Sequence, residues 1–451
     1  MKPGNLAALL ALAAIPAAAA GDWPMLARNP ERHAATPEVV RPPYRLAWKH
    51  AFGEMVEIRV EPIVARGKVL VGTYAGRLHA LAARDGKSLW TFQTGGPILH
   101  SPCVADGTVY LTSHDRHVYA VSLSAGRQKW KFRTGAGVWS SPLLFQATVF
   151  VTGRDGVCYA LDATTGREIW RFNARYPIYQ SPAIDTKTKT LFFGAEDMTA
   201  YALRCADGKP LWRKRIVGQS FRDYYPVVAA GAVIFFTMPV HGHAQHGRNP
   251  GSPAAFAEAV AKDPTVQTMF ALDAKTGREL RKHPVIWNTG GGGVMVPGAV
   301  GPDGKMYLNL PQKGRTYMAP MPFGWLDLTT GRMKVLGTRS EFLGAKLGWG
   351  QARIIGDETN KFTLMGSVAA GKEQPVLLNS HHDVLTAFVF DPPKGHHVLG
   401  KSDCPALPDA PQWYANHDNH PSFHSATVAD GRIFWLNQGD WLFAVEHKEG
   451  R

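Results

Sequence analysis

A phrase that ends in tryptophan recurs along the first half of this 451-residue chain. It is ALAARDGKSLW at 80–90, AVSLSAGRQKW at 120–130 and ALDATTGREIW at 160–170. The intervals between successive tryptophans from Trp48 to Trp212 are 42, 40, 40 and 42 residues. A repeat near 40 residues predicts a propeller or a solenoid, because one such unit can bury its faces only against its neighbours.

A second phrase lies between the tryptophan phrases and completes the unit. SPCVADGTVYLT at 101–112 is two apolar runs around an Asp-Gly pair, which predicts a hairpin. Both phrases together divide the chain into eight units of four short strands. We therefore predict an all-β fold, an eight-bladed β-propeller of four-stranded antiparallel blades. We expect LAWKH at 46–50 to supply the outer strand of the last blade, and the repeated tryptophans to pack between blades.

The repeat resembles a known family. ALDATTGREIW at 160–170 matches the tryptophan-docking motif A-x-D-x-x-T-G-x-x-x-W of the quinoprotein superbarrel, and ALDAKTGREL at 271–280 matches it up to the tryptophan. The opening GDWPMLARNP at 21–30 is similar to the usual lead-in of these proteins. The resemblance implies a PQQ-like repeat propeller, the fold of quinoprotein alcohol dehydrogenases, with BamB-like scaffolds as relatives.

The cysteines bear on which cofactor to expect. Many quinoprotein alcohol dehydrogenases carry two adjacent cysteines against pyrroloquinoline quinone (PQQ), whereas Cys103, Cys158, Cys205 and Cys404 are all separate here. We also identify no Glu/Asn/Asp set for calcium, so we expect neither PQQ nor calcium. Four cysteines allow three disulfide pairings, and free buried thiols are the alternative.

The N-terminus has the pattern of an export signal. Lys2 precedes an apolar run from Leu6 to Ile15, and the A-x-A site Ala18–Ala20 follows Pro16. We predict a cleavable signal peptide at 1–20, a lead-in at 21–44 and one propeller at 45–451, either secreted or periplasmic. No cysteine follows the cleavage site directly, so we expect no lipid anchor. No later apolar run reaches 18 residues, so we expect no transmembrane segment.

The formal net charge of +14 favours anionic partners. Outside the cytoplasm, we expect an anionic polysaccharide or a periplasmic or outer-membrane protein rather than nucleic acid. We expect a monomer.

Polar residues gather in connections that an antiparallel meander places on one face. Connections of one kind lead into the innermost strands, and those of the other kind, which include His114 and Arg154, join the second and third strands. The candidates for substrate binding are Arg59, Trp139, Gln180 and Arg222. The candidates for catalysis are His100, Tyr179, Tyr224 and His424. Arginine can pair with a carboxylate, and tyrosine or histidine can move a proton, as β-elimination from a uronate requires.

Two insertions, near 241–268 and 404–424, interrupt the repeat and are rich in histidine. Neutral imidazole suits zinc and copper. The candidate metal ligands are His241, His243, His246, His417 and His420. A polar loop without a metal is the alternative for these histidines.

Three hypotheses for the function follow. The first is a propeller that binds a ligand or a partner at one mouth of its channel, because the sequence contains no complete catalytic motif. The second is a lyase acting on a uronate-containing polysaccharide. The third is a metal- or quinone-dependent oxidoreductase.

Overall fold

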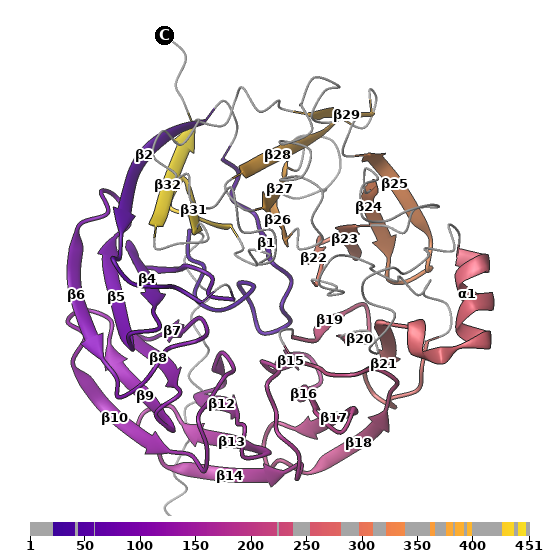
Figure 1. The fold of residues 1–451 in the computed structure, drawn as a ribbon, viewed down its shortest axis with the longest axis horizontal. Coiled ribbons are helices and arrows are strands. Elements are labelled where there is room, and N and C mark those ends of the chain that lie inside the picture. The colour runs from indigo at the N-terminus through magenta and orange to yellow at the C-terminus, as the bar shows by residue number, and fades with distance from the viewer. Residues whose placement is uncertain are drawn as a thin grey trace, which may run out of the picture.

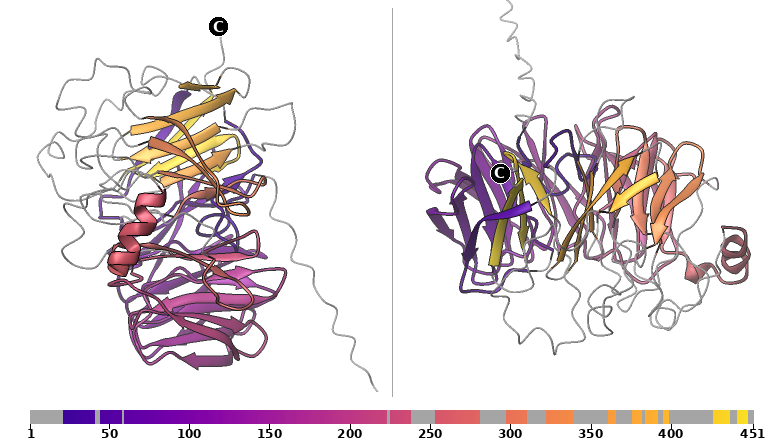
Figure 2. Two further views of the ribbon diagram at one scale, coloured as in Figure 1. Left: turned by 90° about the vertical axis from the view of Figure 1, so that its right-hand side faces the viewer. Right: turned by 90° about the horizontal axis from the view of Figure 1, so that it is seen from above.

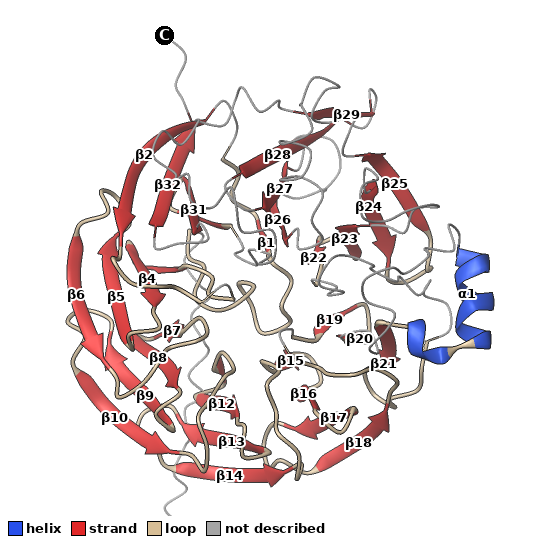
Figure 3. Cartoon of the chain, viewed as in Figure 1, coloured by secondary structure: helices blue, strands red, loops and turns tan. Residues whose placement is uncertain are grey.

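The computed structural model shows a ring of β-sheets around a central axis (Figure 1). Seen from its edge, the ring is a thick disc (Figure 2). Nearly all of its regular structure is strand (Figure 3). The structure describes residues 21–40, 44–57, 59–222, 225–237, 253–280, 297–309, 322–338, 361–365, 376–381, 384–391, 395–398, 426–436 and 441–447. The prediction of an all-β propeller is confirmed.

Four sheets of the same design follow one another in the first half of the chain. Their strands are β3 (Ile63–Ala65), β4 (Lys68–Gly72), β5 (Arg77–Ala82) and β6 (Ser88–Gln93); β7 (Cys103–Ala105), β8 (Thr108–Ser113), β9 (His117–Ser122) and β10 (Gln128–Arg133); β11 (Leu143–Phe145), β12 (Thr148–Thr152), β13 (Val157–Asp162) and β14 (Glu168–Asn173); β15 (Ala183–Asp185), β16 (Thr190–Ala195), β17 (Thr199–Arg204) and β18 (Pro210–Arg215).

The second half of the chain completes the ring. Its strands are β19 (Val227–Ala229), β20 (Ala232–Phe236) and β21 (Met269–Asp273); β22 (Ala299–Val300), β23 (Lys305–Asn309), β24 (Pro322–Asp327) and β25 (Met333–Thr338); β26 (Lys361–Met365), β27 (Val376–His381), β28 (Val384–Asp391) and β29 (Gly395–Val398); β30 (Thr427–Ala429), β31 (Arg432–Leu436) and β32 (Trp441–His447). Within the first predicted insertion, α1 (Pro253–Lys262) and a 3₁₀ turn (Pro264–Val266) lie on the outside of the ring (Figure 1).

The N-terminal part of the chain adds two strands to sheets formed by its C-terminal part. β2 (Tyr44–Ala51) pairs with β32 and becomes the outer strand of the last sheet, as LAWKH at 46–50 predicted. β1 (Ala35–Thr36) joins β26 in parallel. The ring is thus closed by segments from opposite ends of the chain, which covers the sheet faces that the first and last blades of an open array would expose.

The prediction of an eight-bladed propeller of four-stranded antiparallel blades is wrong. Across the described residues, seven blades are antiparallel throughout, and one of these, β19–β21, has three described strands. The remaining sheet, β26–β29, carries β1 in parallel as a fifth strand. The error has a physical cause. The phrase count treated AFVFDPPKGHHV at 387–398, which lacks the tryptophan, as an ordinary copy of the repeat. Local patterning also does not reveal a strand added from the lead-in.

Turn chemistry and burial explain why each unit forms a blade. Between β7 and β8, Asp106 and Gly107 both have positive φ angles, 47° and 69°, as the tight hairpin turn requires. Every residue of β8 is buried, because neighbouring blades cover both of its faces. The outer strand β10 is mostly exposed, and its Lys131 and Arg133 discourage pairing with another chain.

The repeated tryptophans join neighbouring blades. The indole N–H of Trp130 donates to the carbonyl of Ala163 in the next blade at 2.9 Å. The ring packs against Gly166, which has a φ of 71° and where a Cβ would lie 2.6 Å from the indole. The same indole bond recurs at Trp90, Trp170 and Trp212. Packing between blades, as predicted for these tryptophans, is confirmed.

The lead-in runs across the middle of the ring (Figure 1). Its backbone forms hydrogen bonds to the innermost strands of five sheets, at Val64, Val104, Ile184, Val228 and Val300. The segment therefore links neighbouring blades and also blades that lie across the ring from one another.

Two carboxylates and one arginine fix the lead-in in place. Asp22 accepts from the backbone of Arg66, and Glu38 accepts from Gly431, both in turns that follow an innermost strand. The fully buried Arg32 donates to two backbone carbonyls, at 2.6 and 2.9 Å. The two carboxylates thus bond to turns on one face of the ring, whereas Arg32 reaches the carbonyl of Pro182 just before β15. No helix in the described part of the chain is long and apolar enough to span a membrane.

Candidate functional site

One face of the ring carries the connections in which the predicted site residues lie. Strands alternate in direction within each blade, so the connections into the innermost strands share a face with the turns between the second and third strands. We call this the loop face. The lead-in bonds to the turns of the opposite face.

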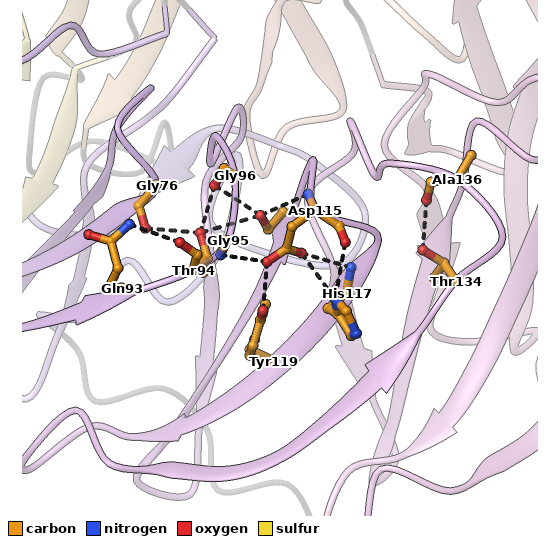
Figure 4. Close-up of polar contacts among 11 residues, drawn as sticks. Gly76, Gln93, Thr94, Gly95, Gly96, Asp115, His117, Tyr119, Thr134 and Ala136 are labelled. Atoms are coloured by element: carbon orange, nitrogen blue, oxygen red, sulfur yellow. Dashed lines mark hydrogen bonds and ion pairs between the residues drawn. The ribbon is translucent and has the colours of Figure 1, made fainter.

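A carboxylate clamp holds each of two turns on the loop face, and Figure 4 shows the first of them, at Asp115. Asp115 accepts from the backbone N–H of Gly95 in the preceding blade at 2.7 Å and from the Tyr119 hydroxyl at 2.6 Å. It also accepts from the backbone of His117 at 3.0 Å. Burial, followed by the bond to Asp115, raises the pKa of Tyr119. The clamp fixes the turn between β8 and β9, together with its neighbour His114.

The next blade repeats the clamp. Asp155 accepts from Gly135 at 2.7 Å, from the Tyr159 hydroxyl at 2.6 Å and from the backbone of Val157 at 3.2 Å. Burial, followed by the bond to Asp155, raises the pKa of Tyr159. Arg154 precedes Asp155 as His114 precedes Asp115, so these two functional candidates stand at one repeat position in successive blades.

Cations and rings converge beside these clamps. The guanidinium carbon of Arg222 lies 4.7 Å from the centre of the Trp139 ring and 5.6 Å from that of Tyr179. Arg59 lies 5.8 Å from the same Trp139 ring, and Arg154 lies 5.7 Å from Tyr179. The Trp139 ring meets Tyr179 and His114 edge to face. We call these six residues the arginine–aromatic cluster.

Two of the arginines have different partners. Arg59 pairs with Glu57, which also accepts from the Tyr74 hydroxyl. Arg154 donates to Nε2 of His114 at 2.8 Å, and its charge meets no carboxylate among the described residues. Burial, and then the nearby Arg154, lowers the pKa of His114. The cluster and the adjoining Glu57 therefore combine three guanidinium groups with one carboxylate and a neutral imidazole.

Four of the predicted site residues meet in this cluster, and two lie apart from it. Arg59, Trp139, Tyr179 and Arg222 come together. His100 is 6% exposed, with Nδ1 3.3 Å from the Ser141 hydroxyl. Gln180 is fully buried and accepts from the backbone of Gly194 at 2.7 Å. The roles predicted for His100 and Gln180 remain predictions, and these contacts are of the kind that hold a core together.

The other predicted site residues lie outside the described residues. They are Tyr224, His424, His241, His243, His246, His417 and His420.

Sequence reasoning gave no role to four residues that take part in the site. His114 and Arg154 were placed on this face without a function, and Glu57 and Tyr74 were not considered. The signal that could have found three of them is repeat position, because Tyr74, His114 and Arg154 align in successive blades. Glu57 gives no such signal, because it precedes the first complete unit.

Free thiols and groups of metal-ligating side chains are the features that would indicate a metal or quinone site. Cys103, Cys158 and Cys205 are free and buried. Burial raises the pKa of Cys103 and of Cys205 to about 12. Across the described ranges, no three His, Cys, Asp or Glu side chains are grouped to hold a metal ion.

Comparisons with known proteins agree with this fold. The sequence profile of a family described as outer membrane protein assembly factor BamB matches residues 43–142 and 133–293, more than half of the chain. The fold and the repeat thus define a PQQ-like repeat propeller. The chain belongs to the family described as outer membrane protein assembly factor BamB. No match was found among curated proteins.

Solved structures of similar fold include one methanol dehydrogenase and two quinohemoprotein alcohol dehydrogenases. A europium-containing methanol dehydrogenase has a TM-score of 0.62 at 12% identity, with 95% of this chain and 98% of that chain covered. The quinohemoprotein alcohol dehydrogenase ADHIIG from Pseudomonas putida HK5 has a TM-score of 0.59 at 12% identity, with 96% and 82% covered. That of Comamonas testosteroni has a TM-score of 0.56 at 12% identity, with 96% and 82% covered. At this identity, the likeness shows the fold alone.

The described residues do not fit a quinone held with a metal ion. Calcium takes six to eight oxygen ligands. On the loop face, Glu57 is bonded to Arg59 and Tyr74, and Glu196 accepts from Ser220 and Phe221. The donor set is therefore cationic and aromatic, which suits an anion.

Proposed function

We propose that this chain is a binding propeller that takes an anionic, uronate-containing polysaccharide on its loop face. The observation that carries the proposal is the convergence of Arg59, Arg154 and Arg222 on two aromatic rings. A formal net charge of +14 favours the approach of a polyanion to the surface.

The geometry suits a carboxylate bound by arginines that aromatic rings hold in place. A guanidinium group presents its donors in a planar fork that matches a carboxylate, and its pairing there is both directional and charge-assisted. Trp139 and Tyr179 lie beneath these guanidinium groups and hold them in place, and neither ring is fully buried. Clamps at Asp115 and Asp155 hold the neighbouring turns before any ligand arrives, which lowers the ordering cost of binding.

Calorimetric titration with oligogalacturonate tests the proposal. We expect Arg222→Gln to weaken binding about tenfold or more, which corresponds to about 1.4 kcal/mol. The matched control is Arg213→Gln on the exposed strand β18, which removes the same charge far from the cluster. Equal affinity of the two variants would refute the assignment. Absorbance of unsaturated product in the same samples tests the lyase hypothesis.

A second candidate function is a scaffold for an outer-membrane protein, which the family description favours. In that case the same cluster would bind an acidic segment of the partner. A synthetic acidic peptide that competes with oligogalacturonate at Arg222, and binds more tightly than the saccharide, would favour this second function.

We further propose that the protein acts outside the cytoplasm. The support is the signal-like segment at 1–20, which lies outside the described residues. Cell fractionation of the full chain and of a chain lacking 2–20 tests this: the first should be exported and shortened, and the second should stay inside.

A further inference from the structure

We infer that His114 and Arg154 form a carboxylate subsite that takes up a proton on His114 when its ligand binds. This inference rests on the proposed function, because it requires an anionic ligand at the arginine–aromatic cluster. It goes beyond that proposal in two respects: it names a carboxylate as the group that is recognised, and it makes binding depend on pH.

The hydrogen bond between the two side chains defines the unliganded state. A guanidinium group can only donate, so Nε2 of His114 must accept from Arg154 across their 2.8 Å contact. An imidazole whose Nε2 accepts carries its single proton on Nδ1 and is neutral. His114 is therefore a neutral acceptor beside a permanent cation, with the Trp139 ring 6.2 Å away edge to face.

The charges around His114 support this neutral state. Burial contributes most to lowering its pKa, and Arg154 contributes next. Asp115 acts in the opposite direction. However, the Asp115 carboxylate already accepts from Gly95 and Tyr119, so it is held by the clamp and does not turn toward the imidazole.

A bound carboxylate would reverse this balance. If it pairs with Arg154, it places a negative charge within a few ångströms of the imidazole and competes for the guanidinium donors. Nε2 can then take a proton from solvent and donate to the carboxylate, which forms a second charge-assisted hydrogen bond. No covalent bond forms or breaks, and the ligand anion is balanced by one arginine and one histidinium.

Thermodynamic linkage fixes the direction of the pH effect. A group that binds a proton more tightly in the complex takes up that proton on binding, so affinity rises as pH falls. The rise is confined to the range between the pKa of free His114, which lies below its ordinary value of 6.5, and its higher pKa in the complex.

The experiment is calorimetric titration of the full chain with oligogalacturonate at pH 7 in phosphate and in Tris, buffers that differ in ionisation enthalpy. We expect proton uptake with wild type and almost none with His114→Gln, whose amide oxygen can still accept from Arg154. The control His50→Gln changes a histidine on outer strand β2 and should keep the uptake. No binding by wild type overturns the proposed function itself, whereas binding with equal uptake by His114→Gln overturns only this inference.

A second measurement does not depend on any variant. The ring carbon shift of His114, followed by NMR on ¹³C-histidine-labelled protein, gives its pKa with and without oligogalacturonate. We expect the pKa to rise on binding. An unchanged or lower value with bound ligand would overturn the inference, and a sulfated saccharide without carboxylates tests whether any anion has the same effect.

Discussion

Adjacent residues in the same turn behave differently across blades. Asp115 and Asp155 make the same three kinds of contact, with nearly equal distances, in neighbouring blades. His114 and Arg154, one residue earlier, differ in type and bond to each other. The comparison teaches that a position repeated with its contacts builds the ring, whereas a position that varies in a fixed framework is free to form a site.

The largest effect should come from breaking a repeated contact in the core. Trp130→Ala removes a buried ring and its bond to Ala163, and such truncations cost about 3–5 kcal/mol of unfolding free energy. Urea unfolding followed by tryptophan fluorescence measures the loss. Oligogalacturonate should bind the folded fraction with unchanged Kd; weaker binding would mean that blade packing and the cluster are not separable.

The clamp should come next in size. Asp115→Asn keeps the shape but loses charge-assisted bonds to Gly95 and Tyr119, and hydrogen bonds to charged groups contribute about 1.5–3 kcal/mol. The same unfolding assay applies, with the adjacent His114→Gln as its control. If both variants lose equal stability, the contrast between repeated and varying positions fails.

Alkaline pH should weaken the clamps by a smaller amount. The pKa values of Tyr119 and Tyr159 are raised in the folded protein, above the ordinary value of 10.0. Since the unfolded chain then releases protons first, stability is present below pH 10 and falls as pH rises toward the folded pKa. Unfolding midpoints at pH 8, 10 and 11 measure this decline. Tyr119→Phe should cost about 1 kcal/mol at pH 8 and make the decline shallower.

The smallest effect on stability should come from the varying position. Arg154→Gln removes a charge that meets no described carboxylate, so the unfolding free energy should change by about 0.5 kcal/mol or less. Its affinity for oligogalacturonate should nevertheless fall about tenfold, or about 1.4 kcal/mol. A loss of stability similar to that of Asp115→Asn would make Arg154 a structural residue.

Much of the fold could be predicted because it is built from contacts at a fixed sequence spacing. The indole of Trp130 reaches Ala163 in the next blade, and Trp90 reaches Leu123 in the same way. Such pairs lie one repeat apart, so the repeat itself reveals them. The number of equivalent blades was wrong, because β1 crosses the ring to join β26 and leaves no periodic trace.

The site was only partly predictable, for a related reason. Sorting connections by face grouped Arg59, Trp139, Tyr179 and Arg222, which meet in the cluster, with the buried His100 and Gln180, which lie apart from it. Alternation of strands fixes the face on which a residue lies. It does not fix whether the side chain turns toward the axis or into the contact between blades.

The sequence by itself determined the blade, the docking of each tryptophan and the face on which each connection lies, since all three depend on neighbouring units. Only the tertiary structure decided that the lead-in crosses the ring and that Arg59 and Arg222 meet at one indole. Closure is the physical reason: the distance between residues across a ring depends on the summed twist and tilt of every blade between them. No single repeat encodes that sum.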